Sequence, residues 1–191
     1  MQTKNIMIVG VGGQGSLLAS KLLGAVSGKM GYDVKVSEVH GMSQRGGSVV
    51  TYVRFGDKVY SPLICKGEAD YIIAFEKMEG ARYLPYLKKG GTLIVNTQEI
   101  APMAVLTGKT EYPWDILEKI EGDVSIFPLD ALSYAVSAGS AKAVNIVLMG
   151  YFAKYMPEIP LKAWEEAMAE VMQPKYLEMN KKAFALGYTH F

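Results

Sequence analysis

Gly10-Val11-Gly12-Gly13-Gln14-Gly15 is the stretch that decides the fold, because the periodicity of the chain changes across it. Residues 6–9 before it are continuously apolar, as in a buried strand, and apolar residues recur at helical spacing from Leu17 to Val26 after it. The stretch is therefore a turn from a strand into a helix. The first N–H groups of a helix have no partner within it, and glycine lets an anion approach them closely.

The same glycines also fit a nucleotide-binding motif. Gly10, Gly12 and Gly15 match G-x-G-x-x-G, the fingerprint of dinucleotide-binding turns. The fingerprint alone does not separate a nucleotide site from a tight turn in an α/β domain that holds no ligand. Gly13 and Gln14 make this version of the motif unusual.

A second glycine-rich loop follows the next predicted strand, between His40 and Gly47. Arg45 lies in it, and a guanidinium group suits phosphate or carboxylate. A solvated arginine on an exposed loop is the plainer interpretation, but two glycine-rich loops after successive strands favour a shared anion site. The candidate binding residues are Gly10, Gly12, Gly13, Gln14, Gly15, Ser43, Gln44, Arg45, Gly46 and Gly47.

The first 130 residues alternate between strand-like and helix-like segments, which predicts an α/β fold with a three-layer, Rossmann-like sheet. Strands are predicted at residues 5–9, 34–39, 71–75, 92–95 and 124–127, and helices at 13–30 and 77–89, the second stopped by Gly90-Gly91. The β-rich run over 49–55 is expected to return as a hairpin through Gly56-Asp57 to Val59-Tyr60. The sheet is then mixed rather than purely parallel.

Residues 131–191 are predicted to be mainly helical and to complete a single domain over 1–191. Asp130 is the expected N-cap of a helix over 131–138, and Ser140 is the expected cap of a longer helix after it. The last helix is expected at 175–186, closed by Gly187.

Two polar side chains follow further predicted strands. Glu76 comes directly after the strand over 71–75, and Asn96 after the one over 92–95. Ligands of open α/β sheets bind beyond the carboxyl ends of the strands, so these residues and both glycine-rich loops should meet at one edge. Glu76, Glu79 and Arg82 have the i, i+3 spacing that is typical of a solvated helix face.

Composition limits the possible chemistry. The chain has 191 residues and a formal net charge of +1, so no nucleic-acid partner is indicated. We expect a cytoplasmic protein, since neither a signal peptide nor a membrane-spanning run is visible. Cys65 is the single cysteine, which excludes an iron–sulfur cluster held by four thiolates of this chain, and it is expected to be a small packed residue. We predict no catalytic residue set and no metal site, and the methionines of the C-terminal helices should pack in the core.

The motifs together closely resemble the gamma-type domain of 2-oxoacid:ferredoxin oxidoreductases. The resemblance is carried by residues 10–15, 37–50, 59–64, 67–70 and 83–91 and covers nearly the whole chain. The free-standing length and the segment 143–150 look most like the beta subunits of the indolepyruvate-specific enzymes. The resemblance implies oxidative decarboxylation of an arylpyruvate with coenzyme A, which gives an aryl-acetyl-CoA and passes electrons to ferredoxin.

The resemblance also implies which parts this chain lacks. The family uses thiamine diphosphate, and its metal-binding Gly-Asp-Gly motif is approached here only by Gly122-Asp123-Val124. Thiamine diphosphate, magnesium and iron–sulfur clusters are therefore expected in a larger alpha subunit, which is the expected partner. The glycine loops of this chain would accept an anionic group of coenzyme A or face the substrate channel.

Two other functions stay open on the sequence alone. The first is an independent NAD-dependent oxidoreductase, which rests on G-x-G-x-x-G and on Glu38 near the position of a ribose-binding acid. For Glu38 itself we favour pairing with a neighbouring strand or with a basic residue. The second is a purely structural subunit whose glycine turns hold no ligand.

Overall fold

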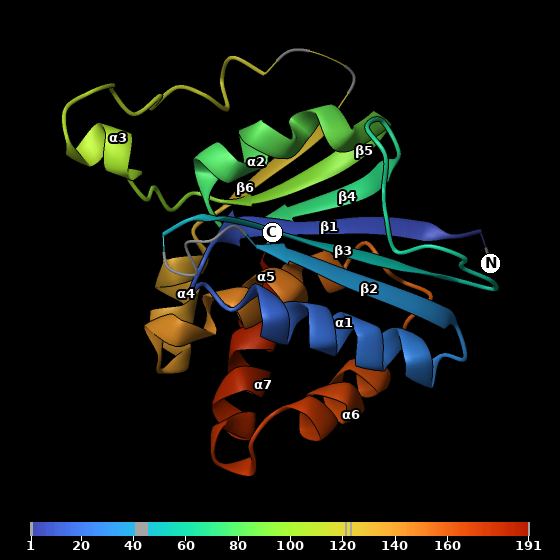
Figure 1. The fold of residues 1–191 in the computed structure, drawn as a ribbon. Coiled ribbons are helices and arrows are strands. Elements are labelled where there is room, and N and C mark those ends of the chain that lie inside the picture. Colours follow the sequence, from blue (N-terminus) through green and yellow to red (C-terminus); the bar gives the residue numbers. More distant parts are fainter. Residues whose placement is uncertain (1, 41–45, 121, 123, 191) are drawn as a thin grey trace.

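The computed structural model describes residues 2–40, 46–120, 122 and 124–190, and these form a mixed sheet between two layers of helices and loops (Figure 1). Strand order in the six-stranded sheet is β2-β3-β1-β4-β5-β6. The strands are β1 (Lys4–Val11), β2 (Asp33–His40), β3 (Ser48–Gly56), β4 (Ala69–Ala74), β5 (Leu87–Asn96) and β6 (Ser125–Leu129). The helices are α1 (Ser16–Lys29), α2 (Lys77–Tyr83), η1 (Leu84–Tyr86), α3 (Met103–Leu106), α4 (Ala131–Ala138), η2 (Ala141–Ala143), α5 (Val144–Ala153), α6 (Leu161–Val171) and α7 (Pro174–Thr189).

The sheet is mixed, as predicted, but its hairpin lies elsewhere. β3 pairs antiparallel with both β1 and β2, whereas β1, β4, β5 and β6 are parallel. The predicted return of the chain after Gly56 is wrong. Side-chain hydrogen bonds hold this segment instead: Val59 N donates to Asp33 Oδ2 (2.9 Å), and Arg54 Nη1 donates to the carbonyl of Ser61 (2.9 Å). The hairpin of this sheet is formed by β2 and β3. Since β3 is antiparallel to both of its neighbours, β2 runs parallel to β1 and ends at the same edge of the sheet.

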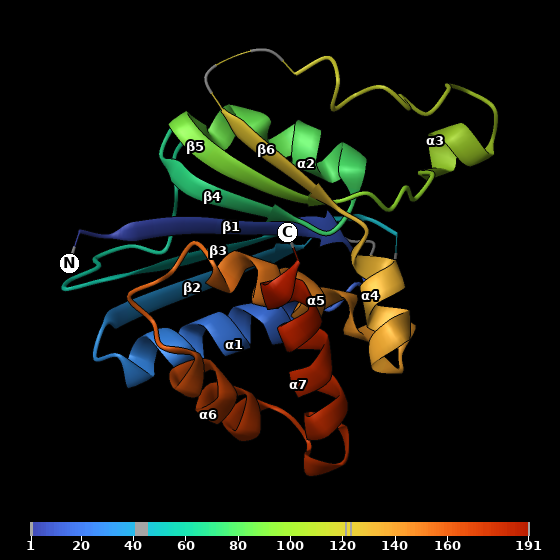
Figure 2. The same cartoon turned by 180° about the vertical axis from the view of Figure 1, so that it is seen from behind.

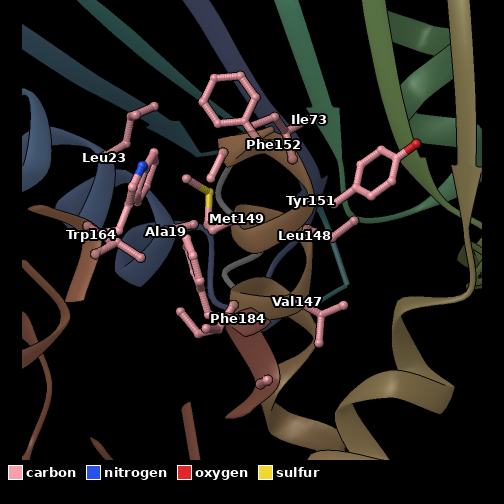
Figure 3. Packing of buried hydrophobic residues seen from close by; sticks show 14 of the residues in the cluster. Ala19, Leu23, Ile73, Val147, Leu148, Met149, Tyr151, Phe152, Trp164 and Phe184 are labelled. Atoms are coloured by element: carbon pink, nitrogen blue, oxygen red, sulfur yellow. The ribbon is translucent and has the colours of Figure 1, made fainter. Parts of the chain in front are cut away.

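The two faces of the sheet are covered differently. α1 and α5 lie against one face, with α6 and α7 packed on their outer side, and α2 with the connection between β5 and β6 covers part of the other face (Figures 1 and 2). Side chains of β1 alternate between these layers: Ile6 and Ile8 join the larger core, while Met7 and Val9 join the smaller one. The larger core is centred on α5, whose ten residues are all buried (Figure 3).

The predicted helix over 77–89 is too long. Helix α2 ends at Tyr83, and a 3-10 turn follows at Leu84–Tyr86. The chain from Leu87 to Asn96 belongs to β5. Pro85 explains why the α-helix does not continue, because proline lacks the N–H that the next α-helical hydrogen bond needs. Gly90-Gly91 lies inside β5 rather than at the end of a helix.

The C-terminal helices largely follow the prediction. Asp130 caps α4, as predicted, by accepting a hydrogen bond from Ser133 N (3.1 Å). Ser140 does not cap the longer helix: it accepts from Lys142 N (3.2 Å) and caps the 3-10 turn η2, while α5 begins after Ala143 without a side-chain cap. The core methionines include Met149, Met156 and Met168, all at most 1% exposed. Cys65 is exposed rather than packed, because the segment between β3 and β4 runs along the surface. No helix of the described residues combines the length and apolarity needed to cross a bilayer.

Glycines bring α5 and α7 into backbone contact. A Cβ built on Gly150 would lie 2.0 Å from the carbonyl oxygen of Phe184, and one on Gly187 would lie 2.0 Å from that of Val147. The prediction that Gly187 closes the last helix is wrong, because Gly187 lies within α7, which continues to Thr189. Glycine is needed at both positions because any side chain would push the helices apart.

We predict that Gly150→Ala lowers the free energy of unfolding by about 1–3 kcal/mol, the typical effect of overpacking a core. Urea denaturation monitored by circular dichroism would measure the change. Gly28→Ala is the matched control, because Gly28 lies in α1 with open space around its Cβ position. It should leave stability unchanged or raise it by up to about 1 kcal/mol. Equal losses in both variants would contradict the packing argument.

Candidate functional site

The Gly10–Gly15 turn joins β1 to α1 at the carboxyl edge of the sheet. Gly13 (φ 102°) and Gly15 (φ 89°) have left-handed backbone conformations that other residues rarely adopt. Gly15 is the N-cap of α1, no side chain caps the helix, and its first turn carries no acidic residue. The positive end of the helix dipole is therefore available to an anion.

The side chain of Gln14 holds this turn against the neighbouring strand. Its Oε1 accepts from Val11 N (2.7 Å), and its Nε2 donates to the carbonyl of Phe75 (3.0 Å) and to Gln98 Oε1 (3.4 Å). A Cβ on Gly10 would lie 2.9 Å from Phe75 Cβ and 2.7 Å from Gln14 Oε1, so glycine is required there. The amide of Gln14 is thus used within the protein, and it positions the turn.

The second glycine-rich loop reaches the first at its described end. Gly12 N donates to the carbonyl of Gly47 (2.9 Å), which fixes the exit of the second loop beside the first turn. Gly46 has a left-handed conformation (φ 77°). Ser43, Gln44 and Arg45 lie outside the described residues.

Asn96 and Glu76 also lie at this edge, as the strand pattern predicted. Asn96 Nδ2 donates to the carbonyl of Phe75 (3.1 Å), and its Oδ1 accepts from Ala131 N (3.2 Å), so it ties β5 to the start of α4. Glu76 caps α2 by accepting from Glu79 N (2.8 Å).

The predicted solvated helix face is wrong for two of its three residues. Glu76 is fully buried and Glu79 is 3% exposed. Glu76 accepts from Ile100 N (3.3 Å) and from Tyr112 Oη, and Glu79 accepts from Arg82 Nε (3.0 Å) and from Ser48 Oγ. Helical spacing could not reveal this, because the donors come from the β5–β6 connection and from β3.

A pocket of about 530 Å³ opens in front of the Gly13–Gly15 turn. Its far wall comes from the C-terminal part of the chain and includes Lys142, an exposed residue of the 3-10 turn before α5. The pocket is lined by Gly13, Gln14, Gly15, Gln98, Leu132, Ala141, Lys142 and Val144. A lysine and an uncapped helix start give it the donor set of a site for anions.

Lys142 and Gln98 were missed by the sequence analysis. The cap at Ser140 marked the start of a helical segment, but only the fold shows that this segment faces the glycine turn. Buried Asn145 connects the two parts, since its Nδ2 donates to the carbonyl of Gly15 (3.2 Å).

Glu38 is not placed as a ribose-binding acid. It accepts a long hydrogen bond from Thr51 Oγ1 (3.5 Å) of the neighbouring strand, as favoured from the sequence. β3 lies between β1 and β2, so Glu38 is two strand spacings, about 10 Å, from the line of β1. In the described part of the chain, no group of three or more His, Cys, Asp or Glu side chains could hold a metal ion.

Comparison with known proteins places the chain in a family. Residues 5–190 match the family of pyruvate ferredoxin/flavodoxin oxidoreductases, and the chain belongs to it. Indolepyruvate oxidoreductase subunit IorB of Pyrococcus horikoshii is 45% identical over 98% of this chain and 95% of its own length. The protein of the same name from Archaeoglobus fulgidus is 40% identical over 96% and 93%. The resemblance to the gamma-type domain is therefore confirmed.

Solved structures share the fold. Pyruvate oxidoreductase subunit PORC of Thermotoga maritima has a TM-score of 0.76 at 20% identity, over 98% of this chain and 96% of its own. The 2-oxoglutarate:ferredoxin oxidoreductase of Magnetococcus marinus has a TM-score of 0.75 at 18% identity, over 98% of this chain but 30% of its own. The same fold thus occurs as a separate subunit and as part of a longer polypeptide.

We predict that Tyr112→Phe lowers the free energy of unfolding at neutral pH by about 1–3 kcal/mol, because Glu76 loses a donor inside the core. Burial, and next the bond to Glu76, raise the pKa of Tyr112 above its usual 10. The stabilisation that Tyr112 contributes is complete below pH 10 and decreases as the pH rises above 10. The free energies of unfolding of the wild type and the variant should therefore approach each other above pH 10. Urea denaturation at several pH values would test this. Tyr60→Phe, at an 89% exposed position, is the control; a constant difference at all pH values would contradict the argument.

Proposed function

We propose that this chain is the small subunit of an indolepyruvate oxidoreductase and that its pocket receives an anionic group of coenzyme A. The observation that carries the first part is the identity of 40–45% over nearly the whole chain to relatives named indolepyruvate oxidoreductase subunit IorB. The pocket with Lys142 and the Gly13–Gly15 turn supports the second part.

In the proposed complex, this chain works with a larger alpha subunit. The alpha subunit would hold thiamine diphosphate, magnesium and iron–sulfur clusters, for which this chain offers one exposed cysteine and, among its described residues, no metal-binding group. The complex would convert an arylpyruvate and coenzyme A to an aryl-acetyl-CoA and pass the electrons to ferredoxin. We place it in the cytoplasm, as expected from the sequence.

The proposed role of this chain in that reaction is binding and orientation. Coenzyme A carries phosphate groups, and the Lys142 ammonium and the N–H groups at the start of α1 are suited to hold one of them. Gln14 and Asn145 keep the turn in place from inside the protein. Arg45 of the second loop is proposed as a further anion-binding residue on the basis of its motif.

An independent NAD-dependent enzyme is the weaker alternative, because β3 separates Glu38 from the glycine turn. Titration of the isolated chain with NADH would revive this alternative if binding proved tight and specific.

We predict that the chain alone gives no turnover and that co-expression with the alpha subunit gives coenzyme A-dependent reduction of ferredoxin by indolepyruvate. Assays with indolepyruvate, phenylpyruvate and pyruvate would rank the substrates. Turnover by the single purified chain, or a preference for pyruvate, would contradict the proposal.

In the assembled complex, Lys142→Ala should raise the Kd for coenzyme A about tenfold, the equivalent of roughly 1.4 kcal/mol. Isothermal titration would measure it. Lys162→Ala is the matched control, because Lys162 is an exposed lysine of α6 outside the pocket.

Arg45→Ala separates the binding role from a purely structural one. Normal assembly with lost turnover would support the binding role, whereas normal assembly with normal turnover would favour a structural subunit.

A further inference from the structure

An arm of the chain, residues 98–114, extends away from the sheet at its carboxyl edge. The arm follows β5 and carries α3 clear of the sheet and of the other helices (Figures 1 and 2). It presents large apolar side chains to solvent: Met103 is 70% exposed, Leu106 68% and Trp114 63%. Side chains so exposed contribute little to the stability of this chain.

The base of the arm is fixed to the start of α2. Lys77 N donates to the carbonyl of Gln98 (3.1 Å). Lys77 Nζ forms an ion pair with Glu99 (2.9 Å) and donates to the carbonyl of Trp114. The buried carboxylate of Glu76 also holds both ends of the arm, through the bonds described above. The ends of the arm are therefore already ordered, which lowers the entropic cost of binding a partner there.

Further exposed apolar side chains lie at the same edge of the sheet. Leu17 is in the first turn of α1, and Leu132 and Val136 are one turn apart on α4. Leu132 also lines the pocket in front of the Gly13–Gly15 turn. The start of α1, α3 and α4 lie at one end of the molecule (Figures 1 and 2).

We call this set the apolar rim, and it consists of Leu17, Met103, Leu106, Trp114, Leu132 and Val136. A single exposed apolar side chain is normal on a protein surface, whereas several of them around a polar site mark a surface that another protein covers. Aromatic and large aliphatic side chains are also the groups that anchor protein interfaces.

We propose that the apolar rim is the surface on which the larger alpha subunit docks, so that the pocket opens into the interface between the two chains. This inference rests on the proposed function. Coenzyme A that is held in the pocket by a phosphate has to bring its thiol to the site where the substrate is oxidised, and that site belongs to the proposed alpha subunit. The pocket therefore has to face the alpha subunit, and the rim lies around the pocket.

The affinity between the two purified subunits tests the proposal. Leu106→Asp and Val136→Asp each place a charge on the rim without changing a residue that lines the pocket. Each should raise the Kd for the alpha subunit by at least about tenfold in isothermal titration. The melting temperature of each isolated variant should stay close to that of the wild type, because both side chains are exposed.

Leu161→Asp is the matched control. Leu161 is also an exposed leucine, but it lies in the first turn of α6, at the end of the molecule opposite α3 (Figures 1 and 2). The control should bind the alpha subunit with the wild-type Kd. An equal loss of affinity in the control and in the rim variants would overturn the proposal.

Hydrogen–deuterium exchange gives a readout that needs no substitution. Amides of the arm and of α4 should exchange more slowly in the complex than in the isolated chain, whereas those of α6 should not change. Unchanged exchange in the arm and in α4 would contradict the proposed interface.

Other outcomes separate this inference from the proposed function. If the rim variants bind the alpha subunit as tightly as the wild type does, the interface lies elsewhere, while the proposed function stands on the turnover of the wild-type complex. If the wild-type chains do not assemble, the proposed function and this inference fall together. If Leu106→Asp converts a dimer of this chain to a monomer in sedimentation velocity and leaves the Kd for the alpha subunit unchanged, the rim binds a second copy and the proposal is wrong.

Discussion

The carbonyl oxygen of Phe75 is the group on which the carboxyl edge of the sheet depends. It accepts hydrogen bonds from two side-chain amides, Gln14 of the turn after β1 and Asn96 at the end of β5. Phe75 itself follows β4, which lies between those two strands, so three neighbouring strand ends are joined at one atom. Buried polar groups that are fully satisfied in this way rigidify their surroundings. Gln14, which lines the pocket in front of the turn, is held in a fixed position by this arrangement.

Close approach of the backbones of α5 and α7 makes the larger helical layer rigid. α5 is buried over its whole length, and α7 crosses it with glycine on both sides of the contact. α5 also carries Asn145, which reaches the carbonyl of Gly15. The helix packing thus acts directly on the glycine turn, and the C-terminal third of the chain supplies both a wall of the pocket and part of its support.

Local patterns in the sequence predicted the fold class, the mixed sheet, the cap at Asp130, and the meeting of strand ends at one edge. They failed where a distant segment decides the outcome. The place of the hairpin depends on Asp33 and Arg54, whose partners lie in the irregular chain after β3. Glu76 and Glu79 have the spacing of a surface helix, yet donors from other elements make their burial possible.

The candidate site likewise combines a part that a local motif reveals with a part that depends on distant packing. The glycine turn could be found from its motif, because its conformation is a local property. Lys142 has no motif, and its place opposite the turn follows only from the packing of α5 against α1. A sequence read element by element therefore finds one wall of such a pocket and misses the other.

The fully buried Glu76 has a structural effect on the connection between β5 and β6. Ile100 and Tyr112 both donate to one oxygen of its carboxylate, so the chain leaves and returns at nearly the same point. The residues between them, which include α3, form a closed surface loop whose ends are held independently of its length. Insertions, deletions and substitutions in this loop should leave the strands that it joins undisturbed. Variation among relatives should concentrate there while the edge of the sheet stays constant.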